Sequence, residues 1–119
     1  MTTSTTLNFT EAYRNGALIL ELSGAIDGPF ALEPATEVAI SSQAAHVIVV
    51  ISGVDYINSA GFGALIRLSD AVTEKKKGLF IVGLQSKVHV VFQILGASSV
   101  LNVLPTLNDA LARIQALAK

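Results

Sequence analysis

The sequence predicts a single α/β domain with a mixed β-sheet of about four to five strands and about four α-helices. Three observations support this. The length of 119 residues suits one hydrophobic core. An Asn-Gly dipeptide near the N-terminus separates two β-type runs. Two wholly apolar runs, 47–51 and 79–84, enclose a helical pattern, as in a βαβ unit with parallel strands.

The first two strands are expected to form an antiparallel hairpin. Residues 7–13 and 17–23 flank Asn15-Gly16, a dipeptide that tolerates the positive φ angles of a tight turn. Residues 1–6 form a polar Thr/Ser tract, which we interpret as a flexible N-terminal tail, so the domain is expected to comprise residues 7–119.

A first helix is expected after this hairpin. Gly24 and the group 27–29 are expected to break the second strand. Pro29 suits the first turn of a helix that runs to about Gln43. Its apolar face would consist of Phe30, Ala31, Pro34, Ala35, Val38 and Ala39.

The centre of the chain gives the clearest pattern. Residues 46–51 are β-branched and apolar from Val47 onward, as in a strand that is covered on both faces. A helix over 60–77 follows, with Gly78 just beyond it, and residues 79–84 form the next strand. The apolar positions of that helix are Phe62, Leu65, Ile66 and Val72.

The C-terminal part predicts two more helices. Ser86 would cap a short helix that ends at Gly96, and residues 100–103 would add a short edge strand. The segment 106–109 fits a capping box, with Asp109 in place of the usual Glu. The terminal helix would bury Leu107, Leu111, Ile114 and Leu117.

Composition limits the possible functions. The chain is 51% hydrophobic and 14% charged, so it can bury enough apolar surface to fold. Its longest apolar run, 47–51, is far short of the ~20 residues of a membrane-spanning helix, and residues 1–6 do not resemble a signal peptide. We therefore expect a cytoplasmic protein without membrane insertion.

Charge and cysteine content exclude further classes. There is no cysteine, so thiolate chemistry and disulfides are absent, and metal binding has few ligands available. The net charge is −1, and the only basic cluster, 75–77, suits the solvated end of a helix. We expect neither a metal nor nucleic acid as a ligand.

The sequence offers little for catalysis. Its two histidines, His46 and His89, fall in a core strand and a short helix, and the nine carboxylates are scattered. No catalytic triad and no phosphate-binding loop with a lysine can be assembled. We expect a protein that is not an enzyme and has no cofactor.

The informative segment is 52–63, which connects the central strand to the best helix. In a parallel sheet, this edge is where ligands and partners bind. Ser59 falls at the expected N-cap, where its hydroxyl would accept a backbone N–H. A phosphate there would add a charge of about −1.5 to −2, tolerated by the helix N-terminus but disruptive to a partner packed over it. Gly61 and Gly63 would let a partner's backbone approach, although serine and glycine are also ordinary residues at a helix start.

The run 51–65 resembles the signature of STAS domains, the family of bacterial anti-anti-sigma factors and of the soluble tails of sulfate transporters. That signature has a hydrophobic strand, a Leu-Ser-Gly-Val-like piece, an aromatic-hydrophobic pair and then Asp-Ser-Ser-Gly or Asp-Ser-Thr-Gly. The segments 24–27, 95–96 and 106–111 also resemble family motifs, in the same order. The similarity thus extends over nearly the whole chain.

The resemblance implies a cytoplasmic anti-sigma factor antagonist. In its unphosphorylated form such a protein binds a serine/threonine kinase that acts as an anti-sigma factor, which frees the sigma factor. The kinase ends binding by phosphorylating the motif serine, here Ser59, and a serine/threonine phosphatase restores it. The resemblance places Asp27 near that serine. The residues expected to bind the partner are Asp27, Asn58, Ser59, Ala60, Gly61, Phe62 and Gly63.

Two positions depart from the motif. Asn58 replaces the acidic residue before the serine, and Ala60 replaces the second hydroxyl, so Ser59 is the only hydroxyl of the motif. Asn keeps the size and hydrogen-bonding capacity of Asp but lacks its charge.

Two alternatives come from other classes. The first is a STAS-like subunit that docks constitutively on a transporter or a signalling assembly without phosphorylation. The second is a receiver-like domain phosphorylated on Asp55, but it lacks the acidic pair that would hold Mg²⁺.

Overall fold

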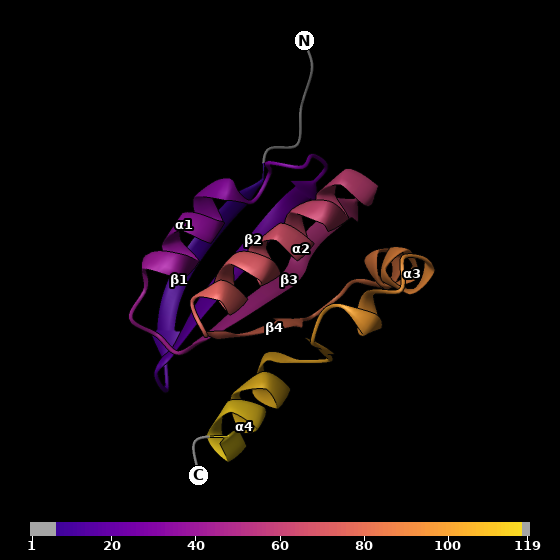
Figure 1. Cartoon of the computed structure of the whole chain (residues 1–119). Helices are drawn as coiled ribbons and strands as arrows, with labels where there is room; N and C mark the ends of the chain where they lie inside the picture. The colour runs from indigo at the N-terminus through magenta and orange to yellow at the C-terminus, as the bar shows by residue number, and fades with distance from the viewer. Residues whose placement is uncertain (1–6, 118–119) are drawn as a thin grey trace.

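The five strands of the sheet lie side by side in the order in which they occur in the sequence. The first pair is antiparallel and the remaining pairs are parallel. A computed structural model describes residues 7–117 (Figure 1), so the expected tail, 1–6, lies outside the described residues.

The strands are β1 (Asn8–Arg14), β2 (Ala17–Ile26), β3 (His46–Ile57), β4 (Gly78–Val82) and β5 (Val103–Leu104). The α-helices are α1 (Glu33–Ser41), α2 (Ser59–Glu74), α3 (Ser86–Ile94) and α4 (Leu107–Leu117). The predicted fold class is confirmed.

The opening hairpin is confirmed, but its second strand is longer than expected. Asn15 and Gly16 both have positive φ, 55° and 80°, as the tight turn requires. Gly24 does not end β2. It adopts φ 105° at a register shift beside Ala25, and pairing with β3 then resumes as far as Ile26. The glycine thus marks an irregularity within the strand.

The first helix begins later than predicted. Pro29 lies in a loop before α1, and Pro34 occupies the first turn, where a missing N–H costs no helical hydrogen bond. Ala35 and Ala39 are buried as expected. Phe30 lies outside the helix, and both it and Pro34 are exposed, so neither belongs to the buried face.

The central βαβ unit is confirmed, with changes at its ends. β3 continues past the predicted end to Ile57, because its last residues still pair with β2 beyond the end of β4. α2 ends at Glu74, before the lysine cluster. The Nζ of Lys77 donates to the backbone carbonyls of Ser42 and Ala44, both at 2.6 Å, and so ties the end of α2 to the end of α1.

The sheet separates two apolar clusters. On one face, Val47 and Val49 of β3 belong to the cluster that packs against α1, α2 and α3. Ile48, which points the other way, packs with α4. Figure 1 shows α1 and α2 lying side by side across the strands, and α4 apart from them. The alternation explains why every residue of 47–49 is apolar.

The C-terminal elements follow the prediction in part. Ser86 is the first residue of α3 and not its cap. The strand predicted over 100–103 is reduced to β5, because only Val103 and the next residue, Leu104, pair with β4. The capping box is confirmed: the N–H of Asp109 donates to Oγ1 of Thr106 at 3.1 Å, and the N–H of Thr106 donates to the Asp109 carboxylate at 3.2 Å. Leu117 is 60% exposed, so it does not belong to the buried face of α4, which consists of Ala110, Leu111 and Ile114.

Among the helices of residues 7–117, none combines the length and apolarity that crossing a bilayer requires.

Candidate functional site

The first turn of α2 is capped by Asn58, not by Ser59 as predicted. Asn58 has extended backbone angles, φ −117° and ψ −177°, and its Oδ1 accepts the N–H of Gly61 at 2.8 Å. Asn is as good an N-cap as Ser, and it stands one residue earlier in the chain. Ser59 is therefore the first residue of the helix, and its hydroxyl is not used for capping.

Ser59 presents its side chain at the surface. The residue is exposed, and within residues 7–117 its hydroxyl has no hydrogen-bond partner. It lies on the first turn of a 16-residue helix, where the unpaired N–H groups give a partial positive charge. A group added to this hydroxyl would meet solvent and the positive end of the helix dipole.

Asn58 also connects this turn to the end of β2. Its Nδ2 donates to the backbone carbonyl of Asp27 at 3.1 Å, and its backbone N–H donates to the carbonyl of Ile26 at 3.4 Å. The structure thus brings Asp27, which is exposed, to the edge of the site formed by Asn58 and Ser59. One amide side chain therefore caps α2 and holds the β2–α1 loop at the same time.

The remaining predicted residues divide into a buried and an exposed group. Gly61 is buried, and a side chain there would collide with the carbonyl oxygen of Ile26, so its smallness serves the domain's own packing and does not admit a partner. Phe62 is buried too, with its ring in an edge-to-face contact with Phe92 at 5.4 Å between centroids. By contrast, Ala60 is exposed, and Gly63 has open space around it.

Two exposed aromatic residues near the site were missed in the sequence. Tyr56, three positions before Ser59, is 51% exposed, and Phe30, three positions after Asp27, is 59% exposed. The ring of Phe30 lies under the guanidinium of Arg67, 5.2 Å from its centroid. The available signal was the position of each aromatic residue, three positions from Ser59 or from Asp27.

Few side chains near Ser59 could bind a metal ion or act as a general acid or base. Within the described residues, no cluster of three or more His, Asp and Glu side chains could hold a metal ion. Asp55 is exposed in β3. His46 lies at the opposite end of β3 from Ser59, and His89 is on α3, so the structure does not gather the histidines with the serine.

Solved structures share this fold. An anti-sigma factor antagonist from Mycobacterium paratuberculosis is 21% identical, with a TM-score of 0.77, and the match covers 97% of this chain and 99% of that one. The phosphorylated Bacillus cell fate determinant SpoIIAA is 16% identical, with a TM-score of 0.62 and coverages of 90% and 99%. A sulfate transporter family protein from Wolinella succinogenes is 18% identical, with a TM-score of 0.74 and coverages of 90% and 91%.

A comparison with curated proteins by sequence finds no match. The family model of the STAS domain, however, matches residues 10–110, from β1 into α4. This range includes Asn58, Ser59, most of β1 and the other four strands in full. The chain therefore belongs to the STAS domain family.

Proposed function

We propose that this protein is a bacterial, cytoplasmic anti-sigma factor antagonist that is switched by phosphorylation of Ser59. The unphosphorylated form binds a serine/threonine kinase that acts as an anti-sigma factor and so releases the sigma factor. The observation that carries the proposal is the exposed, unpartnered hydroxyl of Ser59 on the first turn of α2. A kinase can reach this hydroxyl without unfolding the site.

A phosphate at Ser59 would act mainly on the partner. It would carry about −1.5 to −2 charges at neutral pH, and the helix N-terminus tolerates such an anion. A partner surface that packs over the neutral serine would instead have to bury that charge, which is costly without a matching cation. Binding is therefore lost while the fold of this protein is kept.

The partner surface is expected to consist of the exposed members of the predicted set. Ser59 and Ala60 of α2 and Asp27 of the β2–α1 loop are exposed, and Gly63, which is half-buried with open space around it, follows one turn later. Gly61 and Phe62 support this surface from inside the domain. Asn58 is half-buried and holds the two exposed segments together.

The similar structures support the proposal at the level of fold. Two of them are described as anti-sigma factor antagonists, and SpoIIAA has been solved in both its unphosphorylated and its phosphorylated form. We propose accordingly that the protein is not an enzyme, needs no cofactor, and depends on a serine/threonine phosphatase to regain its unphosphorylated form.

A second function is favoured by one residue and one structural neighbour. Asn58 stands where the family motif has an acid, and a protein of the sulfate transporter family has the same fold. Both suit a STAS subunit that docks constitutively on a transporter or a signalling assembly without phosphorylation.

Intact-mass measurement after expression beside the native neighbours separates the two functions. Wild type is compared with Ser59→Ala, and any added phosphate is mapped. A single acid-stable phosphate at Ser59, absent from the variant, supports the antagonist. If no phosphate appears and a partner co-purifies equally with both forms, the switch fails and the docking subunit is the better account.

A further inference from the structure

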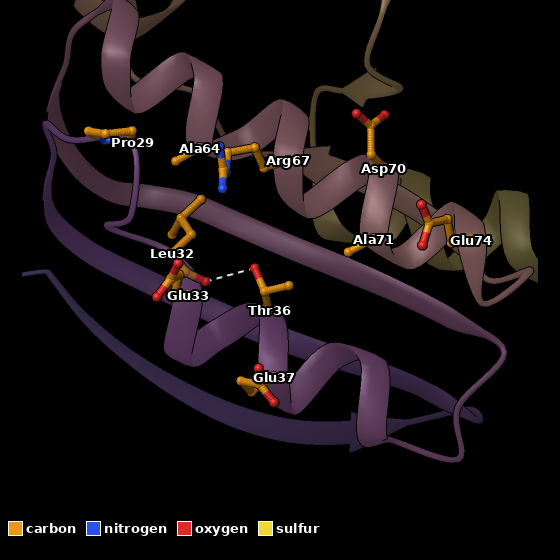
Figure 2. Close-up of a pocket in the computed structure, with 10 residues that line it drawn as sticks. All are labelled: Pro29, Leu32, Glu33, Thr36, Glu37, Ala64, Arg67, Asp70, Ala71 and Glu74. Carbon is orange, nitrogen blue, oxygen red and sulfur yellow. Dashed lines mark hydrogen bonds between the residues drawn. The ribbon is translucent and has the colours of Figure 1, made fainter.

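A groove of about 440 Å³ lies between α1 and α2 (Figure 2). Its floor is apolar: Leu32 and Ala64 are almost fully covered by the domain's own packing, each 2% exposed, and Ala71, which is half-buried, is the accessible part of the floor. The two alanines keep the α2 side of the floor low, because a methyl group is the largest group that either projects. Aliphatic side chains of a bound segment could therefore pack against Ala71.

The walls of this groove are acidic. Glu33 and Glu37 come from α1, Asp70 and Glu74 come from α2, and all four are exposed. Only one basic side chain, Arg67, lines the groove among the described residues. Its guanidinium already lies over the ring of Phe30. Four carboxylates thus line the groove with one guanidinium, in a chain whose net charge is only −1.

The groove begins close to the site of Ser59. Ala64 follows Ser59 by five residues on α2, which is about 7.5 Å along the helix axis. On the other side, Pro29 follows Asp27 by two residues and lines the same groove. Figure 2 shows Arg67 near this end and Glu74 toward the other. A protein docked over Ser59 could therefore extend along the groove.

We propose that this groove binds a basic amphipathic segment of the protein that docks on Ser59. Lysine or arginine side chains would pair with the acidic walls, while a narrow aliphatic stripe would contact Ala71 on the floor. An amphipathic helix laid in a groove supplies both kinds of contact, and complementary charge also speeds the encounter. The identity of the partner rests on the proposed function, but the chemistry of the groove does not.

A synthetic peptide tests this chemistry directly. The probe is a fluorescent 18-residue amphipathic helix of Leu, Ala and Lys, titrated at low salt and followed by anisotropy. The double variant Glu37→Lys/Asp70→Lys reverses the charge of one residue on each wall of the groove. Glu11→Lys/Glu21→Lys is the matched control, because it changes the net charge equally at exposed positions of β1 and β2. Circular dichroism checks that each variant is folded, and Glu37→Gln/Asp70→Asn gives a milder second test.

The groove variant is expected to bind the peptide about tenfold more weakly than wild type. The control is expected to stay within about threefold, because neither of its two residues lines the groove. The amide NMR signals of Ala64 and Ala71 should move on binding. Equal weakening in both variants, or shifts confined to another surface, would overturn the inference. So would spermine binding equally tightly, because that polycation has no aliphatic side chains to contact the floor.

Ser59→Ala separates this inference from the proposed function. The variant should bind the peptide like wild type, since the serine does not line the groove. If the peptide binds but Ser59 is never phosphorylated, only the proposed function fails. If Ser59 is phosphorylated but the peptide does not bind in the groove, only the groove inference fails.

Discussion

Gly61 packs so closely against the carbonyl of Ile26 that a methyl group in place of its hydrogen would overlap the oxygen. The contact joins the first turn of α2 to the end of β2, and Asn58 reinforces it by donating its backbone N–H to the same carbonyl at 3.4 Å. The position of Ser59 is thus fixed by contacts on either side of it in the chain.

Gly61→Ala should be strongly destabilising. The added carbon meets backbone atoms that cannot rotate away, so we expect a loss of at least about 3 kcal/mol in the free energy of unfolding, measured with urea. Gly63→Ala is the matched control on the same helix, because a Cβ there meets open space. It should stabilise by about 0.5–1 kcal/mol. Similar losses in both variants would show that the contact with Ile26 does not matter.

Two substitutions should separate the two roles of Asn58, which caps α2 through Gly61 and clamps the β2–α1 loop through Asp27. Asn58→Asp keeps an oxygen for the N–H of Gly61 but cannot donate to the carbonyl of Asp27, so we expect a loss of about 1 kcal/mol. Asn58→Ala loses both interactions and should cost about 2 kcal/mol. Urea unfolding gives both values, and hydrogen exchange should speed up in the β2–α1 loop of each variant. An unchanged loop in Asn58→Asp would argue against the clamp.

The capping box of α4 should behave as one unit. Thr106→Ala and Asp109→Ala each remove a partner from the same set of hydrogen bonds, so each should cost about 1 kcal/mol. The double variant should cost clearly less than the sum, because the second substitution finds the interaction already lost. Additive losses in a double-mutant cycle would contradict the reciprocal geometry.

Phe62 is expected to contribute to the stability of the fold and not to contact the partner directly. Truncation by Phe62→Ala removes a buried ring and its contact with Phe92, and should cost about 3–5 kcal/mol. Tyr56→Ala, at an exposed aromatic residue of β3, should change the free energy of unfolding by no more than about 0.5 kcal/mol. Comparable thermal melts for the two variants would place Phe62 outside the core.

The sequence predicted the elements whose signals are local. Asn15-Gly16 predicted its turn, Thr106 and Asp109 predicted their capping box, and the apolar runs predicted the parallel strands. The errors arose where neighbouring residues compete for one role. Asn58 and Ser59 are both good caps, and the backbone conformation at Asn58 decides between them.

The tertiary contacts of the site could not be predicted locally. Gly61 suggested an open approach for a partner, yet the carbonyl of Ile26, distant in the sequence, fills that space. The bond from Asn58 to Asp27 spans 31 positions, so no periodicity indicates it. The acidic groove combines side chains of α1 with side chains of α2, whose spacing depends on how the two helices pack.

The most direct test of the switch is the affinity for the kinase partner in the two states of Ser59. Wild type and protein carrying phosphoserine at position 59 are titrated against that kinase by calorimetry, with Ser69, which lies further along α2, phosphorylated as the control for added charge. We predict that phosphate at Ser59 weakens binding at least about 100-fold, near 2.8 kcal/mol, while the control changes it by less than about threefold. Equal affinity for the unmodified and the Ser59-phosphorylated protein would contradict the account.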